Sequence, residues 1–267
     1  QSVLVIGRTT LSRSVNAFIK SSPITYVVDQ RLATVDSDRQ ADRKFTELPD
    51  LQGVIHSDEW IAKWNKVSER AQKLIGSLDG WNEAVIARTI AATIPNDTAL
   101  FVSSSRPIRD LEGFAHPRSG VHTYANRGLA GIDGNISTAL GVAYGHKATI
   151  ALLGDLSFLH DLTGLINKES INCRFIVINN DGGGIFSTLP QRGVTGFETV
   201  FGTPHGLNPA AIAQAMGIDA KQISSLKELE AEIKSPISGV SVVVCDVPDR
   251  ESNADNLKKI VESLSSI

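Results

Sequence analysis

Residues 154–190 read GDLSFLHDLTGLINKESINCRFIVINNDGGGIFSTLP and decide the fold class of this chain. The apolar run Thr149–Leu153 comes directly before Gly-Asp, which is typical of a buried parallel strand that stops at a turn. A second run, Phe175–Ile178, is rich in β-branched residues and stops at Asn179-Asn180-Asp181-Gly182. Between the two runs we expect a helix, because apolar residues recur at helical spacing, at Leu159, Leu162, Leu165 and Ile166.

The ends of these two strands carry oxygen ligands, Asp155 and Asn180. Ligands of open α/β sheets bind at the carboxyl edge, so both side chains are expected there. A carboxylate, an amide oxygen and a backbone carbonyl at Gly182 suit Mg²⁺ or Ca²⁺ rather than zinc. Glycines 182–184 let the backbone approach a bulky anion. The pattern predicts a diphosphate held through a metal; an ordinary pair of α/β loops with an Asp cap is the alternative.

Composition excludes several other classes. A net charge of −3 gives no electrostatic case for nucleic acid, and 42% hydrophobic residues are normal for a globular protein. The longest apolar runs are too short to span a bilayer, and we expect no signal peptide. Cys173 and Cys245 lie in apolar, strand-like runs, so we expect buried free thiols in a reducing compartment, which points to the cytoplasm.

We expect an α/β fold with two parts. Residues 1–50 look like the C-terminal part of a central α/β domain, with strands at 3–6 and 24–28, a helix at 14–20 and irregular structure at 31–56. Residues 51–78 are expected to be a linker with an amphipathic helix at 57–75, and residues 79–267 a doubly wound, mostly parallel sheet. Because the chain opens on Gln1 and enters a core strand at once, we expect a fragment whose N-terminal part is missing.

Within the second part, hydrophobic periodicity and turn residues predict the remaining elements. These are helices at 81–94, 139–144, 208–216, 225–234 and 249–264, strands at 99–102, 121–124 and 239–247, and a mobile loop at 191–206. The glycines of the loop 126–134 have the wrong spacing for a dinucleotide fingerprint. Ser157 follows Gly-Asp and is a candidate donor to the diphosphate, whereas His160 is interpreted as a surface or packing residue.

Gly154-Asp155, followed at this spacing by Asn179-Asn180, resembles the thiamin-diphosphate motif, which begins GDG and ends NN. Leu156 stands where most of that superfamily has glycine. This departure, with the strings ANRG at 125–128, GIDG at 131–134 and IFSTLP at 185–190, is similar to the MenD family, the 2-succinyl-5-enolpyruvyl-6-hydroxy-3-cyclohexene-1-carboxylate synthases. The strong resemblance covers about residues 101–190, and a looser one extends to both ends.

The resemblance implies the cofactors thiamin diphosphate and Mg²⁺ or Mn²⁺, with Asp155, Asn180 and Gly182 as metal ligands. The Gly131 carbonyl is expected to face the aminopyrimidine, and Ile132 to lie beneath the cofactor and keep it bent. The cofactor-binding residues implied are Gly131, Ile132, Gly154, Asp155, Ser157, Asn180, Gly182, Gly183 and Ile185. No catalytic residue is assigned, since the superfamily's activating glutamate comes from a separate pyrimidine-binding domain that no stretch here matches.

The family's substrates, 2-oxoglutarate and isochorismate, each carry two carboxylates, which arginine binds with a planar, two-pronged contact. The resemblance implies Arg127, Arg109 and Ser105 as substrate-binding residues, and more weakly Arg13. A loop salt bridge, helix capping and an exposed helix-face position remain alternatives for Arg127, Ser105 and Arg13, respectively. Ile185, Phe186 and Leu189 resemble the apolar wall of the substrate pocket, which excludes water.

The implied function is decarboxylation of 2-oxoglutarate and addition of the succinyl unit to isochorismate, a transferase reaction of menaquinone biosynthesis. We expect a homodimer or homotetramer for the full-length enzyme. The isolated chain is expected to be inactive and to bind thiamin diphosphate weakly or not at all. The alternatives are another thiamin-diphosphate decarboxylase or synthase that uses pyruvate, and a non-catalytic domain that keeps the fold.

Overall fold

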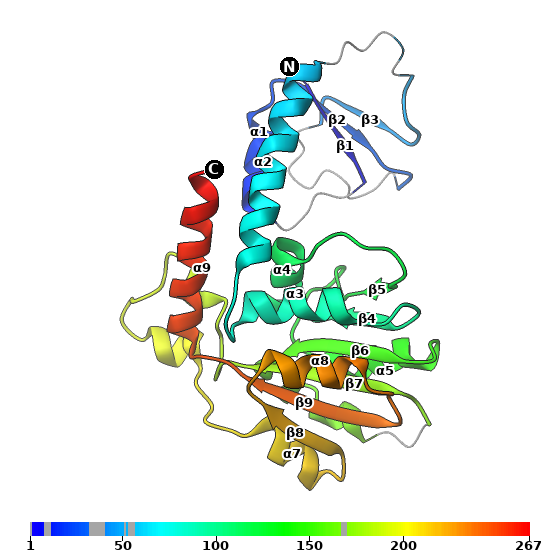
Figure 1. The fold of residues 1–267 in the computed structure, drawn as a ribbon, viewed down its shortest axis with the longest axis vertical. Helices are drawn as coiled ribbons and strands as arrows, with labels where there is room; N and C mark the ends of the chain where they lie inside the picture. The colour runs from blue at the N-terminus through cyan, green and yellow to red at the C-terminus, as the bar shows by residue number, and fades with distance from the viewer. Residues whose placement is uncertain (1, 8–11, 32–40, 51, 53–56, 167–169) are drawn as a thin grey trace. The chain divides into compact units, whose positions relative to one another are not determined.

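The computed structural model describes residues 2–7, 12–31, 41–50, 52, 57–166 and 170–267 (Figure 1). Contacts divide the chain into two compact units, Gln1–Trp64 and Asn65–Ile267. The division lies inside the long helix α2, Asp58–Ser77, which matches the amphipathic helix expected at 57–75. The finer division of the chain at residues 50 and 78 stays a prediction. The irregular stretch expected at 31–56 lies largely outside the described residues.

The first unit contains a parallel sheet in the order β1-β2-β3, formed by Val3–Ile6, Thr25–Val28 and Arg43–Phe45. Helix α1, Arg13–Ser21, connects the first two strands and begins at Ser12, whose Oγ accepts a hydrogen bond from the Val15 N–H at 3.2 Å. Strand β3 was not expected. It is short and mostly exposed, so its sequence lacks the apolar alternation by which buried strands are predicted.

The second unit is built on a six-stranded parallel sheet in the order β5-β4-β6-β7-β9-β8 (Figure 1). All of its neighbouring strands are paired in parallel. The strands are β4 Ala99–Val102, β5 Thr123–Tyr124, β6 Thr149–Gly154, β7 Cys173–Asn179, β8 Asp219–Ile223 and β9 Val240–Asp246. This order confirms the expected α/β fold with a parallel sheet.

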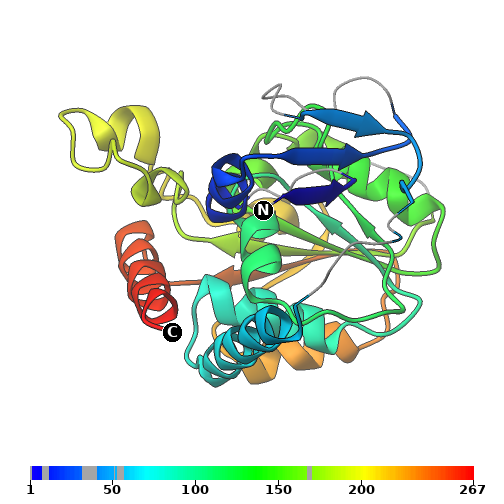
Figure 2. The same ribbon diagram turned by 90° about the horizontal axis from the view of Figure 1, so that it is seen from above.

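Helices cover both faces of this sheet, as Figures 1 and 2 show for α8 and α5. Successive residues of β7 alternate between two cores: Phe175 packs in a cluster with residues of α5 and α7, and Ile176 in a cluster with residues of α3 and α8. The helices are α3 Glu83–Thr93, α4 Arg106–Phe114, α5 Asn135–Tyr144, α6 Asp155–Leu159, α7 Pro209–Ala215, α8 Leu226–Lys234 and α9 Arg250–Ser265. Among the described residues, no helix is long and apolar enough to cross a membrane.

The prediction of a single helix between β6 and β7 is wrong. Helix α6 ends at Leu159, a short 3₁₀ helix, η1, covers Leu162–Leu165, and Ile166 is 73% exposed. The intervening Asp161 is used differently: its carboxylate accepts hydrogen bonds from the backbone N–H and the hydroxyl of Ser137, at 2.7 and 3.1 Å. Aspartate in this role satisfies an N–H of the first turn of α5 and interrupts the regular helix.

Two other segments differ from the expectation. Strand β8 was missed because its sequence, DAKQI, is largely polar and lies at the edge of the sheet. The segment 191–206, expected to be a mobile loop, contains the π-helical turn η3, Glu198–Gly202, and the buried side chain of Phe197. A short 3₁₀ turn, η2, covers Phe186–Thr188 immediately before this segment. The region after β7 is therefore packed through aromatic contacts of Phe186, Phe197 and Phe201.

The two cysteines provide a test of the core. Cys173 and Cys245 are both free and completely buried. Burial raises the pKa of Cys173 to about 12, and it also raises the pKa of Cys245. Because only the thiolate reacts, we expect both thiols of the folded protein to resist an aromatic disulfide reagent at pH 8 and to react at once in guanidinium chloride. Rapid reaction of either thiol without denaturant would contradict this packing.

Candidate functional site: an oxygen-lined cavity at the ends of β6 and β7

Asp155 and Asn180 meet at the carboxyl edge of the second sheet. Strands β6 and β7 are neighbours, with Gly154 paired to Ile178, so the residues that follow them lie side by side. Asp155 is 2% exposed and Asn180 7% exposed. Both line a cavity of about 410 Å³. The position is the one at which ligands bind in open α/β sheets.

The Asp155 carboxylate is held by donors on several sides. Its Oδ1 accepts from the backbone N–H of Leu156 at 2.7 Å, and its Oδ2 accepts from the backbone N–H of Gly182 at 2.8 Å. Burial raises the pKa of Asp155 from its usual value, although these donors and His205 act in the opposite direction. A buried carboxylate that is costly to ionise alone is favourable beside a cation.

Asn180 leaves its oxygen without a protein partner. Its Nδ2 donates to Oε1 of Glu83 at 2.5 Å, whereas its Oδ1 is buried and makes no hydrogen bond to the described residues. Buried polar atoms are normally paired, because an unpaired one costs about 1–3 kcal/mol. A buried amide oxygen that lacks a partner and lines a cavity with a carboxylate is a candidate ligand for a hard cation.

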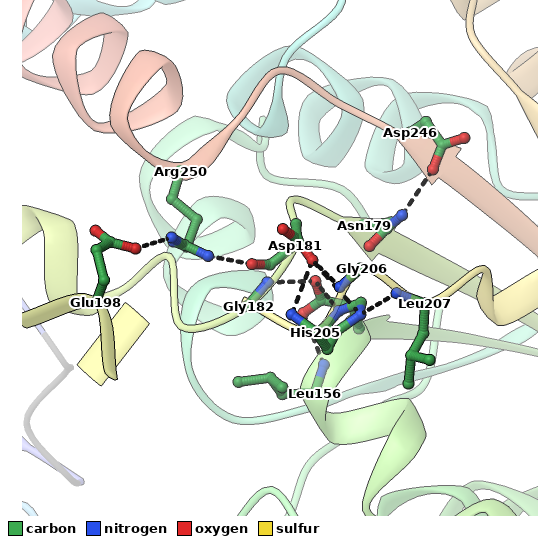
Figure 3. A network of polar contacts seen from close by, with 11 residues as sticks. Leu156, Asn179, Asp181, Gly182, Glu198, His205, Gly206, Leu207, Asp246 and Arg250 are labelled. Carbon is green, nitrogen blue, oxygen red and sulfur yellow. Dashed lines mark hydrogen bonds and ion pairs between the residues drawn. The ribbon is translucent and has the colours of Figure 1, made fainter. Parts of the chain in front are cut away.

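The glycines after Asn180 allow close backbone approaches. Gly182 has a φ of +129°, and a Cβ there would lie 2.2 Å from the carbonyl oxygen of Gly202. The N–H of Gly183 donates to that same carbonyl at 2.7 Å. Arg250 joins this loop to η3, because its guanidinium donates to the Asp181 carbonyl and pairs with Glu198, as Figure 3 shows.

His205 is a site residue that the sequence analysis missed. Its Nε2 lies 3.1 Å from Oδ2 of Asp155. Its Nδ1 accepts from the backbone N–H of Leu207 at 3.0 Å, as Figure 3 shows. Because Nδ1 is an acceptor, the ring is assigned as neutral with its proton on Nε2, donating to Asp155. The only sequence signal is a histidine beside a glycine in a segment without periodicity, which predicts nothing by itself.

Asp181 forms the turn that places this histidine. It adopts a left-handed φ of +60°, and its Oδ1 accepts from the backbone N–H groups of His205 and Gly206, at 3.0 and 2.8 Å. Although burial acts to raise it, these backbone donors lower the pKa of Asp181. An ionised carboxylate therefore anchors the segment after η3 to the loop after β7.

A row of buried charges, also missed, lines another wall of the cavity. Glu83 at the start of α3 pairs with Arg106 of α4 at 3.3 Å, and Arg106 pairs in turn with Asp110. Burial raises the pKa of Asp110, against the lowering effect of Arg106. Ser105, directly before α4, has a φ of +74°, and the neighbouring Ser104 has a buried hydroxyl with no partner among the described residues. Strained residues of this kind cluster at functional sites.

The structure brings most of the predicted site residues to this cavity. Those that line it with Asp155 and Asn180 are Ser105, Arg109, Ile132, Gly154, Ser157, Gly182, Gly183, Ile185 and Phe186. The hydroxyl of Ser157 is engaged, since it donates to the Ile132 carbonyl at 3.0 Å. Phe186 of the predicted apolar wall packs against a further aromatic side chain. Its ring centroid lies 5.4 Å from that of Phe201, whose centroid lies 5.8 Å from that of Phe197.

Four predicted site residues do not line the cavity. Arg127 is half-buried in the loop before α5, and Leu189 is half-buried after η2. The Gly131 carbonyl accepts from Nδ2 of Asn135 at 3.3 Å. Arg13 belongs to the first unit and is exposed. The roles of these residues stay predictions.

The donor set fits a magnesium-bound diphosphate. Within the described ranges, no cluster of three or more His, Cys, Asp or Glu side chains forms a metal site. A cation at this cavity would therefore depend on the Asp155 carboxylate, the Oδ1 of Asn180 and backbone oxygen, a set that leaves Mg²⁺ positions for water and phosphate. Gly154 lines the cavity, and a Cβ at this position would meet nothing within 4 Å, so it leaves room for the anion.

Comparison with known proteins agrees with this geometry. Residues 110–247 match the model of the thiamine pyrophosphate enzyme, C-terminal TPP binding domain. This range includes β6, β7 and the loops that carry Asp155 and Asn180.

The chain is also similar over 99% of its length to proteins named 2-succinyl-5-enolpyruvyl-6-hydroxy-3-cyclohexene-1-carboxylate synthase. It is 34% identical to those of Thermobifida fusca and Paenarthrobacter aurescens, and 31% identical to that of Staphylococcus haemolyticus. It covers 49%, 50% and 50% of these relatives, so the chain spans about half their length. The chain belongs to the thiamine pyrophosphate enzyme family, whose C-terminal TPP binding domain it contains.

Proposed function

We propose that this chain is the diphosphate- and metal-binding part of a MenD-type synthase. The observation that carries the proposal is the pairing of the buried Asp155 carboxylate with the unpartnered Oδ1 of Asn180 at one cavity of a TPP binding domain. The names of the relatives favour this synthase over a pyruvate-using enzyme of the same superfamily. When bound, thiamin diphosphate supplies the carbanion chemistry of decarboxylation and carbon–carbon bond formation.

The chain's own residues hold the cofactor through its charged end. Asp155 and Asn180 bind Mg²⁺ or Mn²⁺, together with the backbone carbonyl of Gly182. Gly154 leaves space for the diphosphate, Gly183 lets its loop pack closely against the Phe201 carbonyl, and Ser157 fixes the loop that bears Gly131 and Ile132. Ile132 and Ile185 line the cavity and supply its apolar contacts to the cofactor. His205 keeps the Asp155 carboxylate oriented through its Nε2 proton.

The substrate side of the cavity combines guanidinium groups with apolar carbon. Arg109 lines it and is positioned by a hydrogen bond from its Nη1 to the Ser105 carbonyl at 2.8 Å. We assign Arg109, Arg127 and Ser105 to the carboxylates of 2-oxoglutarate and isochorismate, in keeping with the planar contact that arginine makes. The weaker assignment of Arg13 stays a prediction from the resemblance. The wall formed by Ile185, Phe186 and Leu189 excludes water from the reacting carbon, so that the succinyl unit is passed to isochorismate.

The metal assignment predicts the effect of Asp155→Asn. The substitution keeps the size of the side chain and removes the charge that the cation needs, so the heat of titration with millimolar thiamin diphosphate and Mg²⁺ is expected to disappear. Asp219→Asn changes an exposed aspartate of β8 and serves as the control that retains the heat. Saturable heats of equal size from the wild-type chain and Asp155→Asn would refute the metal site.

From the packing of the glycine loop, we expect Gly183→Ala to weaken the binding of thiamin diphosphate and Mg²⁺. A Cβ at this position would lie 2.2 Å from the carbonyl oxygen of Phe201, so the loop must shift, at a cost of about 1–3 kcal/mol in unfolding free energy. Gly141→Ala, in α5, meets nothing within 4 Å and is the matched control. Denaturant unfolding and calorimetry measure both effects, and a Gly183→Ala protein as stable as the control would contradict the packing described.

The proposed reaction is tested by release of CO₂. A protein of this family that contains the complete site is expected to release CO₂ from 2-oxoglutarate and to need isochorismate as the acceptor, whereas pyruvate is not used. The 267-residue chain alone, about half the length of its relatives, is expected not to turn over. Turnover by this chain, or equal use of pyruvate, would contradict the proposal. Assembly of the full-length enzyme as a homodimer or homotetramer remains part of the proposal.

A further inference from the structure

Within the described residues, the side-chain amide of Asn180 is hydrogen-bonded through its nitrogen but not through its oxygen. Its Nδ2 donates to Glu83 Oε1 at 2.5 Å, and its Oδ1 has no partner among the described residues. The two ends of an asparagine amide have nearly the same shape, so hydrogen-bonding partners decide which end faces which way. An ionised carboxylate only accepts hydrogen bonds and therefore selects the NH₂ end.

We propose that Glu83 is a positioning residue that fixes the Asn180 amide with Oδ1 directed to the cation. The inference rests on the proposed metal site and names a residue that holds one of its ligands. Without Glu83, the amide is free to turn and to present its NH₂ group, which repels a cation. Partners of metal ligands that fix their orientation are a general requirement of metal sites.

Glu83 is itself held on its other oxygen. Its Oε2 pairs with Nε of Arg106 at 3.3 Å, while Arg106 also pairs with Asp110. Glu83 lies in the first turn of α3, where the helix dipole favours a negative charge, and the preceding Asn82 caps that helix. The carboxylate thus has one oxygen for Arg106 and one for Asn180, in a site where Glu83 is 7% exposed.

The absence of a side chain at Gly184 makes room for the amide of Asn180. A Cβ on Gly184 would lie 2.4 Å from Nδ2 of Asn180, so the amide occupies space that only glycine leaves open. Burying several charges side by side rarely adds stability compared with apolar residues of the same volume. The charged side chains of Asp110, Arg106 and Glu83 form a row that ends at Asn180. Orientation of this candidate metal ligand explains the row better than a contribution to stability does.

The test uses Mn²⁺ alone, titrated into the chain and followed by the electron paramagnetic resonance signal of the free ion. Glu83→Gln keeps the shape but offers both a donor and an acceptor, so either orientation of the Asn180 amide is satisfied. We expect Mn²⁺ binding about 10–100-fold weaker than that of the wild type. Glu230→Gln removes an exposed charge of α8 and is the matched control, expected to bind Mn²⁺ like the wild type.

A polarity swap separates orientation from simple loss of packing. In the double variant Glu83→Gln/Asn180→Asp, the introduced amide donates to the introduced carboxylate, whose second oxygen remains for Mn²⁺, and the total charge is unchanged. We expect the swap to recover most of the affinity lost in Glu83→Gln. Thermal unfolding of the metal-free variants is measured in parallel, because a merely structural role lowers the melting temperature without changing Mn²⁺ affinity.

The side-chain amide protons of Asn180 give a readout that needs no metal. In the metal-free wild type, their nuclear magnetic resonance signals are expected to lie downfield because of the short bond to a carboxylate, and in Glu83→Gln this shift is lost. The inference about Glu83 is overturned if the wild type and Glu83→Gln bind Mn²⁺ with equal affinity, or if the double variant binds Mn²⁺ no more tightly than Glu83→Gln. Either result leaves the proposed metal site standing. A wild-type chain that binds no Mn²⁺ overturns the proposed metal site together with the inference.

Discussion

The hydrogen bond between the Gly182 N–H and the Asp155 carboxylate joins the ends of the two central strands, and the site is built on it. Parallel pairing of β6 and β7 brings the strand ends to one level, but their loops still have to be turned toward each other. The left-handed Asp181 and the φ of +129° at Gly182 make that turn possible. The proposed cation site depends on this turn, because a carboxylate and an amide oxygen then border the same cavity.

Several features at the carboxyl edge of the second sheet lower the stability of the fold when no ligand is bound. The cavity is bordered by a buried aspartate with a raised pKa, by a serine with φ of +74°, and by a buried amide oxygen and a serine hydroxyl that have no partner within the described part of the chain. Each of these features is unfavourable in an isolated fold. A bound cation and anion relieve them together, so ligand binding is expected to be coupled to the stability of this half of the sheet.

Much of the central sheet was predictable because its signals are local. Apolar runs that end at Gly-Asp and at Asn-Asn place Asp155 and Asn180 without any knowledge of distant contacts. His205 and Glu83 were missed because they reach the site across 50 and 97 residues, respectively, and neither lies in a motif. The polar edge strand β8 lacks the alternation of a buried strand, and the leucines after β6 have helical spacing although Asp161 interrupts the helix.

One short segment supports both halves of the site. The ring of Phe201 packs at a tilt against that of Phe186. The carbonyl oxygen of Phe201 lies 2.2 Å from where a Cβ of Gly183 would be, so η3 contacts the proposed apolar wall and the glycine loop at the same time. Under the proposed function, a change of shape in η3 would therefore alter substrate contacts and cofactor contacts together. Divergence of substrate preference through η3 would then be constrained by the need to keep the glycine loop intact.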